Sequence, residues 1–130
     1  MRTNLTLLLT LDPIVEEAMA VALVQKGGIS YLARTSDEAI RIVCSKGSEL
    51  ELAVIDFDHG SNGMTLMSAI DACANHHLPM VALTGAGEEY ARFVALANGA
   101  AECLTKPVSA EQLANAIIRY RPKWELRQVA

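Results

Sequence analysis

The chain has 130 residues, of which 52% are hydrophobic and 20% are charged, and its formal net charge is -4. These values predict one globular domain with a sizeable core and exclude a disordered chain. The acidic balance argues against nucleic-acid binding, which draws its affinity from a basic surface, and no apolar run is long enough to span a bilayer. The short apolar run near the N-terminus leads into Asp12-Pro13 instead of a cleavage site. We therefore expect a cytoplasmic protein with no nucleic-acid or membrane partner.

Strands and helices are predicted to alternate along the chain, with turn residues between them. In chain order we expect strand 5–11, helix 13–26, strand 29–33, helix 35 to about 47, strand 52–57, helix 64–74, strand 80–85, helix 88–97, strand 102–105 and a helix from 109 that Pro122 ends. Asp12 is a good N-cap before Pro13, and Gly27 is a natural stop. Five strand–helix units predict an α/β fold, a doubly wound parallel sheet with helices on both faces. We assign residues 1–121 to this domain and 122–130 to a C-terminal tail or linker.

Three predicted strands have, at or just after their carboxyl end, a polar residue able to handle phosphate. Asp56 lies near the end of the third strand, Thr84 near the end of the fourth, and Lys106 follows the fifth. Side chains at the carboxyl ends of parallel strands converge on the crevice where such sheets bind ligands. A carboxylate, a hydroxyl and an ammonium gathered there can form an aspartyl phosphate and hold its oxygens.

These tips, together with the stretch Ala95–Val108 (ALANGAAECLTKPV), resemble the receiver domain of two-component response regulators over residues 4–121. The resemblance implies the flavodoxin-like strand order 2-1-3-4-5 with five helices. It also implies that Asp56 accepts the phosphate and that Thr84 and Lys106 hold its oxygens.

Three further positions follow from the resemblance. Gly85 leaves room for the phosphoryl group, Cys103 stands at the switch position of the fifth strand, and Pro107 follows the lysine through a bond that is usually cis in the family. The resemblance implies a non-enzymatic signalling domain that receives phosphate from a histidine kinase or phosphotransfer protein with Mg²⁺ present. The face made by the fourth helix, fifth strand and fifth helix then serves a homodimer or an output domain.

The chain departs from the family where receivers carry an acidic, metal-binding pair after the first strand. Those positions are Thr10 and Leu11, and neither supplies the carboxylate oxygens that Mg²⁺ prefers. The acids left for a metal are Asp56, Asp58 and Asp12, and we expect Asp12 to cap its helix. We therefore predict weak or no Mg²⁺-dependent phosphorylation of Asp56. The alternative within the same fold is a phosphorylation-independent interaction module, in which Asp56 simply pairs with the lysine.

A second alternative comes from another class of protein. Asp56 and Asp58 have the spacing of the D-x-D motif in haloacid-dehalogenase-type phosphatases, with Thr84 and Lys106 as later members of the set. That family places its nucleophile near the start of the fold and has a further acidic motif after the lysine. In this chain Glu111 is the only acidic residue between Lys106 and the tail, which favours the receiver interpretation.

Overall fold

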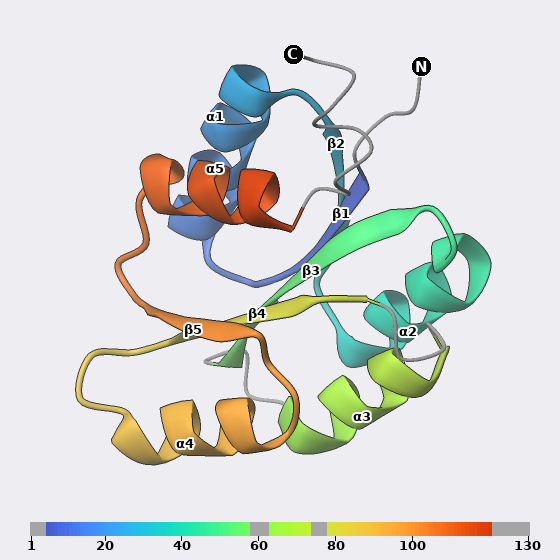
Figure 1. Ribbon diagram of the computed structural model, residues 1–130, viewed down its shortest axis with the longest axis vertical. Coiled ribbons are helices and arrows are strands. Elements are labelled where there is room, and N and C mark those ends of the chain that lie inside the picture. The colour runs from blue at the N-terminus through green and yellow to red at the C-terminus, as the bar shows by residue number, and fades with distance from the viewer. Residues whose placement is uncertain (1–4, 58–62, 74–77, 121–130) are drawn as a thin grey trace.

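The computed structural model describes residues 5–57, 63–73 and 78–120, which form a three-layer α/β fold (Figure 1). The strands are β1 (Leu5–Leu9), β2 (Ile29–Ala33), β3 (Leu50–Asp56), β4 (Met80–Thr84) and β5 (Glu102–Thr105). The helices are α1 (Pro13–Lys26), α2 (Ser36–Lys46), α3 (Gly63–Cys73), α4 (Glu89–Ala97) and α5 (Ala110–Arg119). None of the helices in the described part of the chain has the length and hydrophobicity needed to cross a bilayer.

The sheet has the order β2-β1-β3-β4-β5, and every pair of neighbouring strands is parallel. This confirms the predicted flavodoxin-like topology. Helices α1 and α5 cover one face of the sheet, and α2, α3 and α4 cover the other (Figure 1). The order reverses between β1 and β3, so the carboxyl ends of these two strands flank the point where such sheets bind ligands.

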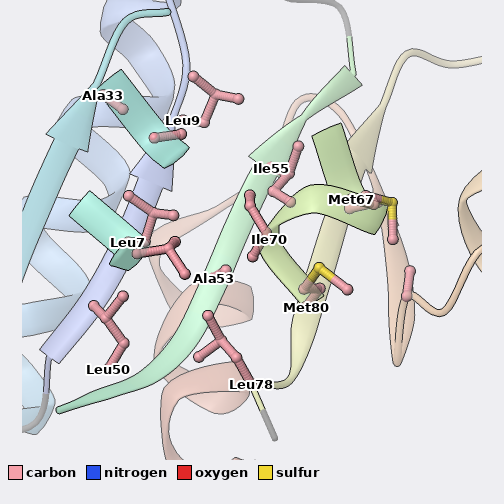
Figure 2. Packing of buried hydrophobic residues seen from close by; sticks show 14 of the residues in the cluster. Leu7, Leu9, Ala33, Leu50, Ala53, Ile55, Met67, Ile70, Leu78 and Met80 are labelled. Atoms are coloured by element: carbon pink, nitrogen blue, oxygen red, sulfur yellow. The ribbon is translucent and has the colours of Figure 1, made fainter. Parts of the chain in front are cut away.

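Two hydrophobic clusters fill the spaces between the sheet and its helices, since the side chains of each strand alternate between the two faces. Between the sheet and α2, α3 and α4, the strand residues Leu7, Leu9 and Ile55 share one cluster with Met67 and Ile70 of α3 and with the neighbours shown in Figure 2. The second cluster, between the sheet and α1 and α5, consists of the residues Leu8, Val15, Met19, Ala22, Leu52, Val54, Val81, Leu83, Val108, Leu113, Ala114, Ala116 and Ile117. The central strands are therefore apolar on both faces, as a buried parallel sheet requires.

Local signals set the helix ends as expected. The Asp12 side chain accepts a hydrogen bond from the backbone N–H of Ile14, and Gly27 ends α1 with a φ of 78°. Ser109 and Gln112 form the predicted capping box at the start of α5. These side chains satisfy N–H groups that have no partner inside the first turn of a helix.

Three element ends differ from the prediction by two residues or more. Strand β1 ends at Leu9 and not at residue 11, and β3 begins at Leu50, two residues early. The β1–β3 register shifts at Leu5, which pairs with Leu50 while Thr6 pairs with Leu52, so pairing extends further back than the apolar run indicates. Helix α5 ends at Arg119, three residues before Pro122, the residue that was predicted to end it.

Candidate functional site

The carboxylate of Asp56 lies at the carboxyl end of β3 and is only 2% exposed. Leu9 of β1 pairs with Ile55 of β3, so the next residues along the two strands, Thr10 and Asp56, are neighbours. The Thr10 hydroxyl donates a hydrogen bond of 2.8 Å to Oδ2 of Asp56. Thr10, where the family pattern has an acid, thus contacts Asp56 directly, through a neutral donor.

Lys106 also contacts Asp56, as the prediction of converging strand ends requires. Its Nζ lies 3.0 Å from Oδ2 and 3.3 Å from Oδ1 of Asp56, and its side chain is 16% exposed. The backbone N–H of Lys106 donates to the carbonyl of Thr84 over 2.7 Å, which anchors the residue at the tip of β4. The peptide bond to Pro107 is cis, as the resemblance implied.

Asp12 joins the same group of charges. Its Oδ2 is 3.3 Å from Lys106 Nζ, while its Oδ1 accepts the capping hydrogen bond from the Ile14 N–H at 2.9 Å. Its own backbone N–H donates to the Thr10 hydroxyl at 3.0 Å. The Ile14 hydrogen bond holds the pKa of Asp12 below its ordinary value, helped by the hydrogen bond and charge of Lys106 and opposed by partial burial. The predicted cap is confirmed, and the same carboxylate also pairs with the lysine.

The Thr84 hydroxyl lies on the other side of the sheet. It is 3.3 Å from the Cys103 thiol, and both residues are buried. Alternation explains this placement, because Leu83 packs under α1 and α5, so that Thr84 faces α2, α3 and α4 together with Cys103. The backbone of Thr84 adjoins the site through Lys106, but in this conformation its hydroxyl is directed at Cys103. Its role with phosphate stays a prediction.

The remaining predicted positions are placed as follows. Gly85 directly follows β4 and is partly exposed, Pro107 is exposed, and Leu11 is 54% exposed beside the site. Asp58 lies outside the described residues, so its proposed part in metal binding or in a phosphatase is untested.

Two interactions that link β5 to its neighbouring helices were not predicted from sequence. Arg92 of α4 donates to the backbone carbonyl of Cys103 at 3.1 Å, linking α4 to β5. Glu102 of β5 pairs with Arg119 and accepts a hydrogen bond from the Tyr120 hydroxyl at 2.7 Å, linking β5 to the end of α5. Burial opposes ionisation of Glu102, but these two hydrogen bonds outweigh it and lower the pKa of this carboxyl. No local motif predicts such long-range contacts. A weak signal was the Arg119-Tyr120 pair at the end of the last helix, which can reach the acid Glu102 on β5.

The sequence matches the family described as response regulator receiver domain over residues 11–118. None of the curated proteins compared with the chain matches it. The family match covers Asp56, Thr84 and Lys106, and it extends from Leu11 to the last turn of α5.

Solved structures resemble the fold over nearly the whole chain. A response regulator receiver domain protein from Clostridium thermocellum is 24% identical, with a TM-score of 0.80 over 95% of this chain and 98% of that chain. A two-component response regulator from Clostridium difficile is 26% identical, with a TM-score of 0.74 over 90% of this chain and 97% of that chain. NtrX from Brucella abortus is 21% identical with a TM-score of 0.79 over 97% of this chain, which spans only 28% of the NtrX chain.

Proposed function

Because the chain belongs to the response regulator receiver domain family of two-component systems, we propose that Asp56 stands at its phosphoacceptor position and undergoes weak or no Mg²⁺-dependent phosphorylation. The domain then acts mainly as a protein-interaction module in phosphorelay signalling. Its partner is a histidine kinase or a phosphotransfer protein, and its location is the cytoplasm. The phosphatase alternative depends on Asp58 and gains no support from the described residues.

The observation that carries this proposal is the hydrogen bond from Thr10 to Asp56. At the position where an acidic side chain would face Asp56 and a metal, this chain has a hydroxyl that donates to the carboxylate at 2.8 Å. The next position is Leu11, which has no ligand atom in its side chain and is largely exposed. Mg²⁺ requires near-octahedral oxygen ligands at about 2.1 Å. The described part of the chain contains no group of three or more His, Cys, Asp or Glu able to hold a metal.

The donor set therefore does not fit Mg²⁺. Among the described residues, the two carboxylates at the site are Asp12 and Asp56, and both pair with Lys106. A unit charge pair in contact near a protein surface is worth about 4 kcal/mol before desolvation, so losing both acids of the pair removes most of the attraction for a divalent ion. Phosphoryl transfer depends on positioning and on neutralising charge at the transferred group. Both requirements are weakened here.

An exposed apolar strip on α4 supports a role in protein binding. Tyr90 is 80% exposed, Phe93 is 68% exposed, and Leu96 follows one turn later. Exposed apolar side chains that cluster on one helix are typical of interaction surfaces. The strip belongs to the face made by α4, β5 and α5, which we propose contacts an output domain or a second copy of the chain.

The direct test is phosphorylation from a small donor. The protein is incubated with acetyl phosphate and Mg²⁺, beside a receiver of known activity, and its intact mass is measured. We expect little or no added phosphate. If some is added, its absence in the Asp56→Asn variant shows that it was attached to Asp56. Stoichiometric labelling that Asp56→Asn abolishes would contradict the proposal.

A further inference from the structure

The Lys106 ammonium lies among three oxygens of two carboxylates. Its Nζ is 3.0 Å and 3.3 Å from the two oxygens of Asp56, and 3.3 Å from Oδ2 of Asp12. The backbone of Lys106 is fixed by its hydrogen bond to the Thr84 carbonyl. We call Asp12, Asp56 and Lys106 the lysine triad. In it, two negative charges share one positive charge.

Contacts with other residues fix both carboxylates of the triad. Asp12 is held by the Ile14 N–H through its Oδ1, which leaves Oδ2 directed at the lysine. Asp56 is held by the Thr10 hydroxyl on Oδ2, in a setting with almost no access to water. A charge-assisted hydrogen bond of this kind is among the stronger ones in proteins. The two carboxylates are thus preorganised around one cation.

We propose that Lys106 is the resident cation of this site: its ammonium takes the place between Asp12 and Asp56 that a divalent ion would need, so that Mg²⁺ does not bind to the unmodified chain. The inference rests on the proposed function, since it explains why Asp56 is present but is not used with a metal. The oxygens stand at distances suited to an ammonium, about 1 Å longer than Mg²⁺–oxygen bonds. A divalent ion placed among them would meet the lysine charge at contact distance.

Removing the resident cation is the first test. In Lys106→Met the two carboxylates keep their positions but lose their shared positive charge, so the variant should gain affinity for Mg²⁺ or Ca²⁺. We expect its Tm, measured by scanning calorimetry, to rise by about 5 °C when the ion is at about ten times its dissociation constant. The unmodified chain should shift by less than about 1 °C. KCl at matched ionic strength is the control for general screening.

Further variants make the test specific. If Lys106→Met folds poorly, Lys106→Gln removes the same charge and keeps a polar side chain. Thr10→Asp retains the lysine and adds a third carboxylate at the position that contacts Asp56, so its Tm should shift by less than about 1 °C with Mg²⁺. In Lys106→Met/Asp12→Asn one of the two carboxylates is gone, and the response to the divalent ion should be lost.

The outcomes separate this inference from the proposed function. A divalent-ion response in Lys106→Met, with none in Thr10→Asp or in the unmodified chain, supports the resident cation. If the unmodified chain or Thr10→Asp is stabilised by Mg²⁺ as strongly as Lys106→Met, or if the Lys106 variants ignore the ion, the proposal is overturned. Stoichiometric phosphorylation of Asp56 in EDTA would show that Asp56 accepts phosphate without a metal. It would refute the interaction-module role in the proposed function and leave the resident cation standing.

Discussion

Replacing Thr10 by Val should destabilise the protein out of proportion to the size of the change. Valine has the shape of threonine, so the substitution leaves no cavity at this fully buried position. It removes the hydroxyl that donates to Asp56 at 2.8 Å and accepts from the Asp12 N–H at 3.0 Å. A hydrogen bond to a charged group contributes about 1.5–3 kcal/mol and a neutral one about 1 kcal/mol. We therefore expect a loss of about 2.5–4 kcal/mol in the free energy of unfolding.

Thr10→Ser is the matched control, because it keeps the hydroxyl and loses only a methyl group. Its expected cost is about 1 kcal/mol. Both variants are measured by urea unfolding followed by far-UV circular dichroism, with the m-value checked for a constant unfolded state. A double-mutant cycle with Asp56→Asn isolates the coupling, which we expect to be about 1–2 kcal/mol. If Thr10→Val costs no more than Thr10→Ser, the hydroxyl does not hold Asp56 and the reasoning fails.

Two predictions concern the rest of the fold. Ser109→Ala removes the side-chain cap of α5 and should lower the free energy of unfolding in urea by about 1 kcal/mol. The control Ser45→Ala removes only hydrogen bonds to carbonyls of its own helix, so its free energy of unfolding should change by less than about 0.5 kcal/mol. Equal effects of the two substitutions would argue against the cap. Hydrogen bonds from Arg119 and Tyr120 lower the pKa of Glu102, so its contribution is present above the ordinary value of 4.5 and is lost as the pH falls below it. Glu102→Gln should therefore be less stable than the unmodified chain at neutral pH, with the difference shrinking in acid; a difference independent of pH would refute this assignment.

Helix α1 shows how much of the fold is encoded locally. Its bounds, Pro13–Lys26, agree with the prediction because the Asp12 cap, the proline and Gly27 act within one turn of the helix ends. The ends of β1 and β3 were less predictable. A strand stops where its partner stops, and the register shift at Leu5 that extends β3 back to Leu50 has no local signature.

The candidate site likewise has contacts that the sequence predicted and contacts that it did not. The contact between Asp56 and Lys106 was expected from the rule that parallel strands bring their carboxyl ends together. The place of Thr84 as a third member stays a prediction: its backbone adjoins Lys106, and its hydroxyl lies 3.3 Å from the Cys103 thiol. Counting alternate residues from Leu83 indicates this orientation of the hydroxyl. The sequence also identified Thr10 only as a missing acid, whereas the register of β1 on β3 makes it the donor to Asp56.

The order of the residues alone determined the alternation of strands and helices, the helix caps and the identity of the groups at the strand tips, because these depend on neighbours within a few positions. Only the tertiary structure decided that one ammonium lies between Asp12 and Asp56 and that a threonine hydroxyl completes the site. Such contacts join residues more than forty positions apart, and strand pairing and the choice of sheet face bring their polar atoms to 2.8–3.3 Å of one another.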